Sequence, residues 1–128
     1  MVKHGFNVHS PIILLESKIE SIDGVRTLKT ALDTGATYMM VPWEIAEVLG
    51  YEPELSKERI NMITASGVEK VPLITLNSVS VLGKKAENVK AIVHDLPPRS
   101  YVDGLLGLSF LKNFKVCLDF REGILEIE

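Results

Sequence analysis

The sequence is poor in cysteine, in aromatic residues and in net charge. It has one cysteine in 128 residues, which excludes an internal disulfide. Aromatic residues make up only 6% of the chain. The net charge is −3, and a negative net charge argues against a basic surface that binds nucleic-acid phosphates. Hydrophobic residues make up 46% and charged residues 24%, the balance of a folded protein. We therefore expect a single domain over residues 1–128.

Long hydrophobic runs are also missing. The longest stretch without charge, Val71–Gly83, has 13 residues and contains hydroxyl and amide side chains, so it is too short and too polar to span a bilayer. At the N-terminus, the apolar run Pro11–Leu15 ends at Glu16, which is not the pattern of an export signal. These features predict a soluble, cytoplasmic protein with neither a membrane nor a nucleic acid as partner.

Alternation with a period of two dominates the pattern that remains. From Phe114 to Phe120, apolar residues alternate with polar ones, which is typical of a strand with one face on a core. The sequence predicts strands at 12–19, 25–32, 71–81 and 89–94, and a C-terminal hairpin over 114–127. Turn pairs such as Asp23-Gly24 and Glu122-Gly123 separate the strands.

Helical signals are few. Pro42 suits a first helical position, Ile45, Val48 and Leu49 lie on one face, and Gly50 ends the helix. A second short helix is predicted over 109–113, with Ser109 as its cap. Closely spaced strands with one or two short helices predict an all-β fold, a small closed barrel.

The most unusual acid is Asp33, because an apolar strand runs directly into it. An ionised carboxylate at the end of a buried strand is costly unless it is hydrogen-bonded or paired. Gly35 permits a backbone turn and the close approach of a ligand, and the Thr34 hydroxyl can bind a neighbouring backbone group. Alone, the tripeptide is equally consistent with an ordinary turn.

A second motif, Leu105-Leu106-Gly107, leads into the predicted helix at Ser109. The order of an apolar strand, Asp33-Thr34-Gly35-Ala36, a hairpin and Leu105-Leu106-Gly107 resembles the retropepsin-like aspartic proteases, which include retroviral proteases and their cellular and prokaryotic relatives. The resemblance extends over nearly the whole chain. It implies an acid-protease-like closed β-barrel and hydrolysis of peptide bonds in peptides or proteins.

The resemblance also implies roles for individual residues. Asp33 would be the catalytic carboxylate of the turn 33–35, and Thr34 and Gly35 would support the site and lock two turns together. The hairpin over about 60–72 would be the flap that closes over bound peptide, with Met62 and Ile63 packing rather than binding. The residues expected to contact substrate are Ala36, Thr37, Thr64, Ala65, Ser66, Gly67, Leu105 and Leu106.

This chemistry needs two carboxylates that share one proton, of which one acts as acid and the other as base. The chain has one Asp-Thr-Gly and is too short for two lobes, so the second Asp33 must come from a second copy across a twofold axis. The apolar C-terminal strands would join the copies. We expect no cofactor, and no metal because the three histidines lack ligand spacing.

Two departures from the family leave alternatives open. Many retroviral members have an acidic residue at the position of Thr37 and an arginine at that of Leu108, and the two side chains associate there. Their joint loss leaves room for a catalytically silent module used for dimerisation or peptide binding. A second alternative is a monomeric barrel that binds a small molecule, with Asp33 as a polar anchor.

Overall fold

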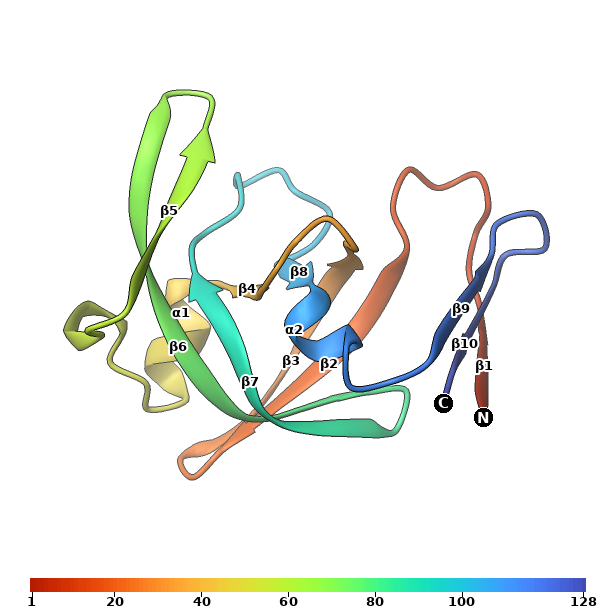
Figure 1. The fold of residues 1–128 in the computed structure, drawn as a ribbon, viewed down its shortest axis with the longest axis horizontal. Helices are drawn as coiled ribbons and strands as arrows, with labels where there is room; N and C mark the ends of the chain where they lie inside the picture. Colours follow the sequence, from red (N-terminus) through yellow and green to blue (C-terminus); the bar gives the residue numbers. More distant parts are fainter.

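Strands dominate the computed structural model, which describes all residues from 1 to 128 (Figure 1). The strands are β1 (Val2–Gly5), β2 (Leu14–Ser21), β3 (Gly24–Leu32), β4 (Met39–Val41), β5 (Arg59–Thr64), β6 (Gly67–Val81), β7 (Lys84–Val93), β8 (Gly104–Leu106), β9 (Val116–Asp119) and β10 (Ile124–Ile127). The helices are α1 (Trp43–Val48), the 3-10 helix η1 (Pro53–Leu55) and α2 (Leu108–Leu111). None of the helices is long enough to cross a lipid bilayer.

The predicted closed barrel is confirmed. Hydrogen-bonded neighbours follow the order β2-β3-β8-β4-β7-β6, and β6 pairs back onto β2. Two parallel pairs stand out, β3 with β8 and β4 with β7, because they bring short strands from distant parts of the chain into the sheet. These parallel pairs place the residues that follow β3 beside those that follow β8.

A packed core fills the barrel. Twenty buried hydrophobic residues form one cluster, with Phe110, Ile19 and Met39 fully enclosed. The Phe110 ring lies 5.0 Å from that of Phe114, in a tilted contact that ties α2 to the chain leading into β9. Because side chains occupy the interior, the functional residues must lie outside the barrel core.

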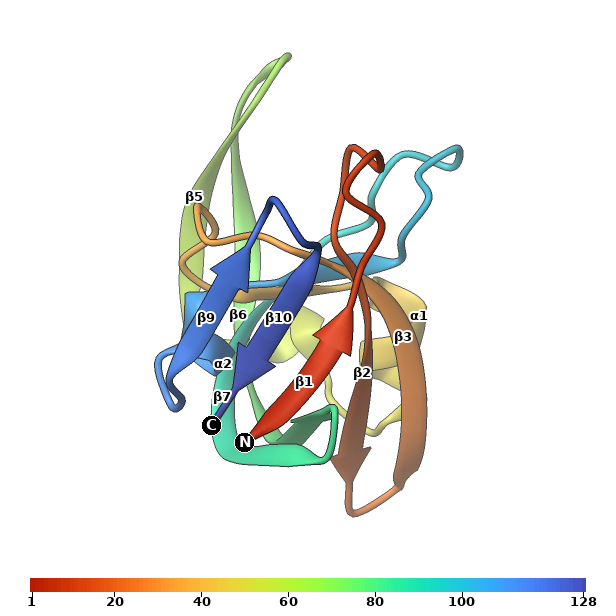
Figure 2. The ribbon, with the colours of Figure 1, turned by 90° about the vertical axis from the view of Figure 1, so that its right-hand side faces the viewer.

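A second, three-stranded sheet stands beside the barrel, in the order β1-β10-β9 (Figures 1 and 2). We call it the terminal sheet, because β1 and β10 carry the two chain ends side by side. Leu125 and Ile127 of β10 join the main core. The N-terminal strand β1 was not predicted, since four residues with one strong apolar position carry a weak alternation signal.

The predicted C-terminal hairpin is present as β9 and β10, but Phe120 does not lie on its buried face. β9 ends at Asp119, whose Oδ1 accepts hydrogen bonds from the N–H groups of Arg121 and Glu122 and turns the chain. Phe120 is therefore 66% exposed and packs edge-on against Phe6, with ring centroids 6.2 Å apart.

Other strand boundaries also differ from the prediction. The strand predicted at 12–19 is β2 at Leu14–Ser21, and those predicted at 71–81 and 89–94 begin earlier, at Gly67 and Lys84. Polar residues occupy these strand starts, so the hydrophobic pattern did not include them. The short strands β4 and β8 form only because distant partners hydrogen-bond them.

Candidate functional site

The loop that contains Asp33 begins where β3 ends and is tied to β8. The Asp33 N–H donates a hydrogen bond to the Leu106 carbonyl oxygen at 3.0 Å, which extends the parallel pairing of the two strands by one residue. The Asp33 side chain is half-buried, whereas Thr34 and Gly35 are exposed. The carboxylate thus lies at the surface at the end of a buried strand, as the sequence indicated.

Local hydrogen bonds orient the carboxylate. Asp33 Oδ1 accepts a hydrogen bond from the Gly35 N–H at 2.9 Å, and the Asp33 carbonyl oxygen accepts one from the Ala36 N–H at 3.2 Å. The second oxygen, Oδ2, makes no hydrogen bond within the chain and is free to bind water or another molecule.

The start of α2 holds the other end of the same loop. The Leu108 N–H donates to the Ala36 carbonyl oxygen at 2.8 Å, and the Ser109 N–H donates to the Thr37 carbonyl oxygen at 2.9 Å. The Leu108 side chain packs against the main core. Backbone hydrogen bonds therefore join the loop to α2. They hold it in place without the acid–arginine pair that many retroviral members have at the positions of Thr37 and Leu108.

Gly107 is the tightest point of this junction. A β-carbon there would lie 2.3 Å from the Tyr38 carbonyl oxygen and 2.7 Å from that of Ala36. At Gly35, by contrast, φ lies outside the left-handed region and a β-carbon would approach only Asp33 Oδ1, at 3.2 Å. The backbone conformation at Gly35 therefore does not itself require glycine, and the tighter steric restriction lies at Gly107.

Ser109 has a role that the sequence did not reveal. Its hydroxyl donates to the Lys90 carbonyl oxygen at 2.7 Å and accepts the Met39 N–H at 2.9 Å. The predicted use of Ser109 as a helix cap is wrong, because the cap is Gly107 and the helix begins at Leu108. Ser109 instead ties α2 to β7 and to the first residue of β4, directly after the Asp33 loop.

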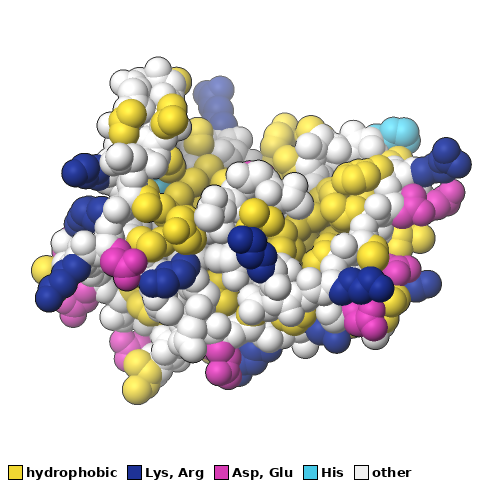
Figure 3. All heavy atoms as spheres, in the orientation of Figure 1, with side chains coloured by type: hydrophobic (Ala, Val, Ile, Leu, Met, Phe, Trp, Pro, Cys, Tyr) yellow, Lys and Arg dark blue, Asp and Glu magenta, His cyan; other side chains and the backbone are white.

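Two apolar hollows flank the Asp33 loop and meet at Leu105. The hollow that contains Asp33 and Thr34 lies against the terminal sheet, and we call it the terminal hollow; its volume is about 520 Å³. The other, of about 340 Å³, lies at the base of the β5–β6 hairpin, and we call it the hairpin hollow. Figure 3 shows hydrophobic side chains gathered at the base of the hairpin and again beside the terminal sheet.

The predicted contact residues divide among these surfaces. Ala36 and Thr37 line the hairpin hollow, together with Tyr38, Met40, Ile60, Asn61, Met62, Ile92 and Leu105. Leu106 is fully buried in the main core, so its side chain lines neither hollow, contrary to the prediction. Successive residues of β8 point to opposite faces, which places Leu105 outside and Leu106 inside.

The β5–β6 hairpin stands away from the barrel (Figure 1). Its tip, Thr64 to Gly67, lines neither hollow, so the structure does not bring these four residues to Asp33. Met62 packs against a small apolar cluster as expected, but Ile63 is 85% exposed, because neighbouring residues of a strand face opposite sides. The Thr64 Oγ1 donates to the Gly67 carbonyl oxygen at 3.0 Å and holds the tip.

Comparison with known proteins identifies the family. Residues 20–113 match the family described as "gag-polyprotein putative aspartyl protease". The chain belongs to this family. The matched residues include Asp33, the β5–β6 hairpin and Gly107, whereas part of the terminal hollow is lined by residues outside the match.

Two rickettsial proteins are similar to the chain. An uncharacterized protein of Rickettsia prowazekii, RP867, is 36% identical over 89 residues, which cover 69% of this chain but only 36% of that protein. The crystal structure of a retropepsin-like aspartic protease from Rickettsia conorii superimposes with a TM-score of 0.74 at 28% identity. That match covers 98% of this chain and 88% of the other, so the fold is an acid-protease-like barrel.

Proposed function

We propose that the protein is an aspartic endopeptidase that works as a homodimer, with one Asp33 from each copy. The observation that carries the proposal is the position of Asp33: a half-buried carboxylate, oriented by the Gly35 N–H, beside a terminal hollow lined by apolar residues. Membership of an aspartyl protease family supports the reaction class. The single Asp-Thr-Gly of the chain supports the need for a second copy.

In the proposed mechanism, two Asp33 carboxyl groups face each other across the twofold axis and share one proton. Like charges this close cannot both ionise readily, so one group stays protonated. The ionised group takes a proton from a water that attacks the scissile carbonyl carbon, while the protonated group hydrogen-bonds to the carbonyl oxygen. No covalent intermediate forms, and the amine leaves with a proton from the dyad.

The remaining site residues have supporting roles in this proposal. Thr34 would bind the partner copy across the axis, and Gly35 would keep the floor of the site open to the peptide backbone. Ala36, Thr37 and Leu105 would receive substrate side chains at the hairpin hollow, which is mostly apolar and favours apolar side chains. The tip residues Thr64, Ala65, Ser66 and Gly67 would close over the peptide as a flap.

Replacement of the carboxylate tests the proposal. Asp33→Asn should abolish cleavage of a denatured protein mixture over a series of pH values while the chain still folds and associates. Glu87→Gln makes the same chemical change at an exposed residue without an ion pair, and should leave cleavage unchanged. Retained cleavage by Asp33→Asn, with the proper fold, would reject the mechanism.

Mixing experiments test the shared site directly. When wild-type chains exchange freely with an equal amount of Asp33→Asn, only about one quarter of the dimers carry two Asp33 carboxylates. Activity should then fall to about one quarter of that of wild type at the same total chain concentration. A fall to only one half would mean that each copy works alone. Complete absence of cleavage by every preparation would instead favour the silent binding module.

A further inference from the structure

A strand edge of the barrel has no partner. β2 pairs with β3 along its whole length, but it pairs with β6 only from Lys18 to Glu20. β6 then turns into β7 through Leu82 and Gly83. Residues 14–17 of β2 consequently have a neighbouring strand on one side only.

The direction of the unpaired backbone groups follows from the ladder. The Leu32 N–H donates to the Ile13 carbonyl oxygen at 2.9 Å, which places the odd-numbered residues of β2 in hydrogen-bonded pairs with β3. The N–H and C=O groups of Leu14 and Glu16 therefore point away from β3, to the side of β2 where β6 no longer pairs. Unpaired backbone groups along a strand edge are a template for another strand.

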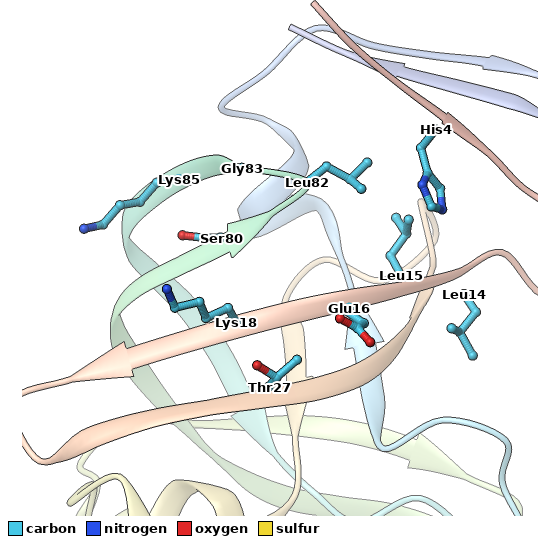
Figure 4. Close-up of a pocket in the computed structure, with 10 residues that line it drawn as sticks. All are labelled: His4, Leu14, Leu15, Glu16, Lys18, Thr27, Ser80, Leu82, Gly83 and Lys85. Carbon is cyan, nitrogen blue, oxygen red and sulfur yellow. The ribbon is translucent and has the colours of Figure 1, made fainter.

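A cavity of about 760 Å³ opens along this edge (Figure 4). Leu14, Leu15 and Leu82 supply its apolar lining, and His4 of β1 forms part of the opposite wall. Figure 4 shows Leu15, Leu82 and His4 pointing into the space between β2, β1 and the β6–β7 turn. The cavity shares no lining residue with either hollow beside the Asp33 loop.

The wall residue Leu82 adopts an unfavourable backbone conformation. Its φ is +52°, in the left-handed region, which is less favourable for a residue with a β-carbon than for glycine. Glycine or asparagine would satisfy the tight turn without this cost. The leucine side chain gives the cavity an apolar wall that neither of these residues would supply.

Positive charge gathers at one end of the cavity. Lys18 lies opposite Ser80, and Ser80 lies opposite Lys85, so the two ammonium groups flank one serine on the same face of the sheet. Lys18 forms an ion pair with Glu20 at 3.5 Å, whereas Lys85 has no carboxylate partner. Glu16 is the one acidic residue in the lining.

We propose that this edge binds an extended peptide as an additional strand. The peptide runs antiparallel to β2 and pairs with residues 14–17 on the side where β6 no longer pairs. The four residues 14–17 offer about 13 Å of edge, enough for a short peptide segment. Alternate apolar side chains of the peptide contact Leu15 and Leu82, and an acidic residue at its amino end lies near Lys85. This site goes beyond the proposed endopeptidase function and does not depend on it.

The test uses the full chain with Asp33→Asn, so that the probe is not cleaved. The probe is an acetylated peptide of about six residues, a glutamate followed by alternating valine and threonine. On binding, amide hydrogen exchange at Leu14 and Glu16 should slow at least about tenfold, because these N–H groups gain carbonyl partners. Exchange at Leu15 and Ser17, whose N–H groups already face β3, should stay unchanged.

Variants separate backbone pairing from charge. Glu16→Pro removes one unpaired N–H at an edge that tolerates proline, and should weaken binding at least about tenfold. The matched variant Glu16→Ala keeps the N–H and should bind the probe at least as well as before. Lys85→Glu should weaken the glutamate probe and strengthen an otherwise identical probe that begins with lysine.

Three results would overturn the proposal. The first is no slowing of exchange at Leu14 and Glu16 with probe at about 1 mM, the weak limit of specific binding. The second is slowing confined to residues of the terminal or hairpin hollow, which would place the peptide at the Asp33 site. The third is equal affinity of Glu16→Pro and Glu16→Ala for the probe. None of these results bears on whether Asp33 supports catalysis.

Discussion

The Ser109 hydroxyl lies between two strands and donates a hydrogen bond of 2.7 Å to the Lys90 carbonyl oxygen. The Ser109 hydroxyl oxygen also accepts a hydrogen bond from the Met39 N–H. One side chain thus connects α2, β7 and the residue that starts β4. The Asp33 loop ends immediately before Met39 and its carbonyl groups rest on the start of α2. Ser109 therefore supports the loop from below without touching Asp33.

Removal of this hydroxyl should impair both stability and turnover. Ser109→Ala leaves the Met39 N–H and the Lys90 carbonyl oxygen without their partner, which should cost about 1–3 kcal/mol in the free energy of unfolding. If the chain is the proposed endopeptidase, kcat should fall about tenfold or more with little change in KM, because the loop is misplaced. Urea unfolding and steady-state kinetics measure the two effects. Ser109→Thr keeps a hydroxyl and should recover much of kcat, whereas Ser100→Ala, at an exposed serine whose side chain forms no hydrogen bond, should change neither quantity.

Gly107 should tolerate no side chain. In Gly107→Ala the β-carbon would collide with the carbonyl oxygens of Tyr38 and Ala36, so we expect a loss of about 3 kcal/mol or more in the free energy of unfolding. Gly5→Ala is the matched control, since its β-carbon would meet nothing closer than the Gly123 carbonyl oxygen at 3.9 Å. Equal unfolding midpoints for the two variants would show that the junction adapts and that this steric account is wrong.

The Thr64 hydroxyl should order the tip of the β5–β6 hairpin. Thr64→Val removes the hydrogen bond to the Gly67 carbonyl oxygen while it keeps a β-branched side chain of similar size. Amide exchange at Ala65 and Ser66 should accelerate, and kcat/KM should fall several-fold if the hairpin closes over substrate. Thr75→Val, at an exposed β6 position whose side chain makes no hydrogen bond, is the control. Unchanged exchange at the tip would refute this role of Thr64.

Tyr51 should make folding stability decline at alkaline pH. Burial raises the pKa of the Tyr51 hydroxyl above its usual value of 10.0, and a hydrogen bond that its oxygen accepts from the Asn77 N–H partly offsets the effect. Because the folded state keeps this proton longer than the unfolded state, the contribution is complete below pH 10 and is lost as the pH rises through the folded pKa.

Comparison with Tyr51→Phe measures this contribution. The variant loses the hydrogen bonds to Asn77, so it should be less stable than wild type by about 1 kcal/mol at neutral pH. The difference in the free energy of unfolding should shrink above pH 10, as wild type alone loses the Tyr51 contribution. A difference that stays constant up to pH 11.5 or so would contradict the raised pKa.

The family and fold class could be inferred from the sequence because they depend on local chemistry. An apolar strand that runs into Asp33-Thr34-Gly35, and a pair of leucines before Gly107, lie in short contiguous segments, and each residue type has a physical reason to be there. Alternating hydrophobicity likewise identified the longer strands, because one buried face produces a period of two in the sequence itself. Strand ends with polar residues, such as those of β6 and β7, carry no such period.

The support of the Asp33 loop was decided only in three dimensions. Ser109, Lys90 and Met39 are far apart in the sequence, and nothing in their residue types announces that they meet. The same holds for Leu106, which faces the core because β8 pairs with β3 and β4 and so fixes which side of the strand is inside. By itself, then, the sequence determined the carboxylate, the strand-rich fold and the family. Tertiary structure alone decided which atoms hold that carboxylate and which strand edges stay open, because hydrogen bonds and packing between distant segments depend on the folded backbone.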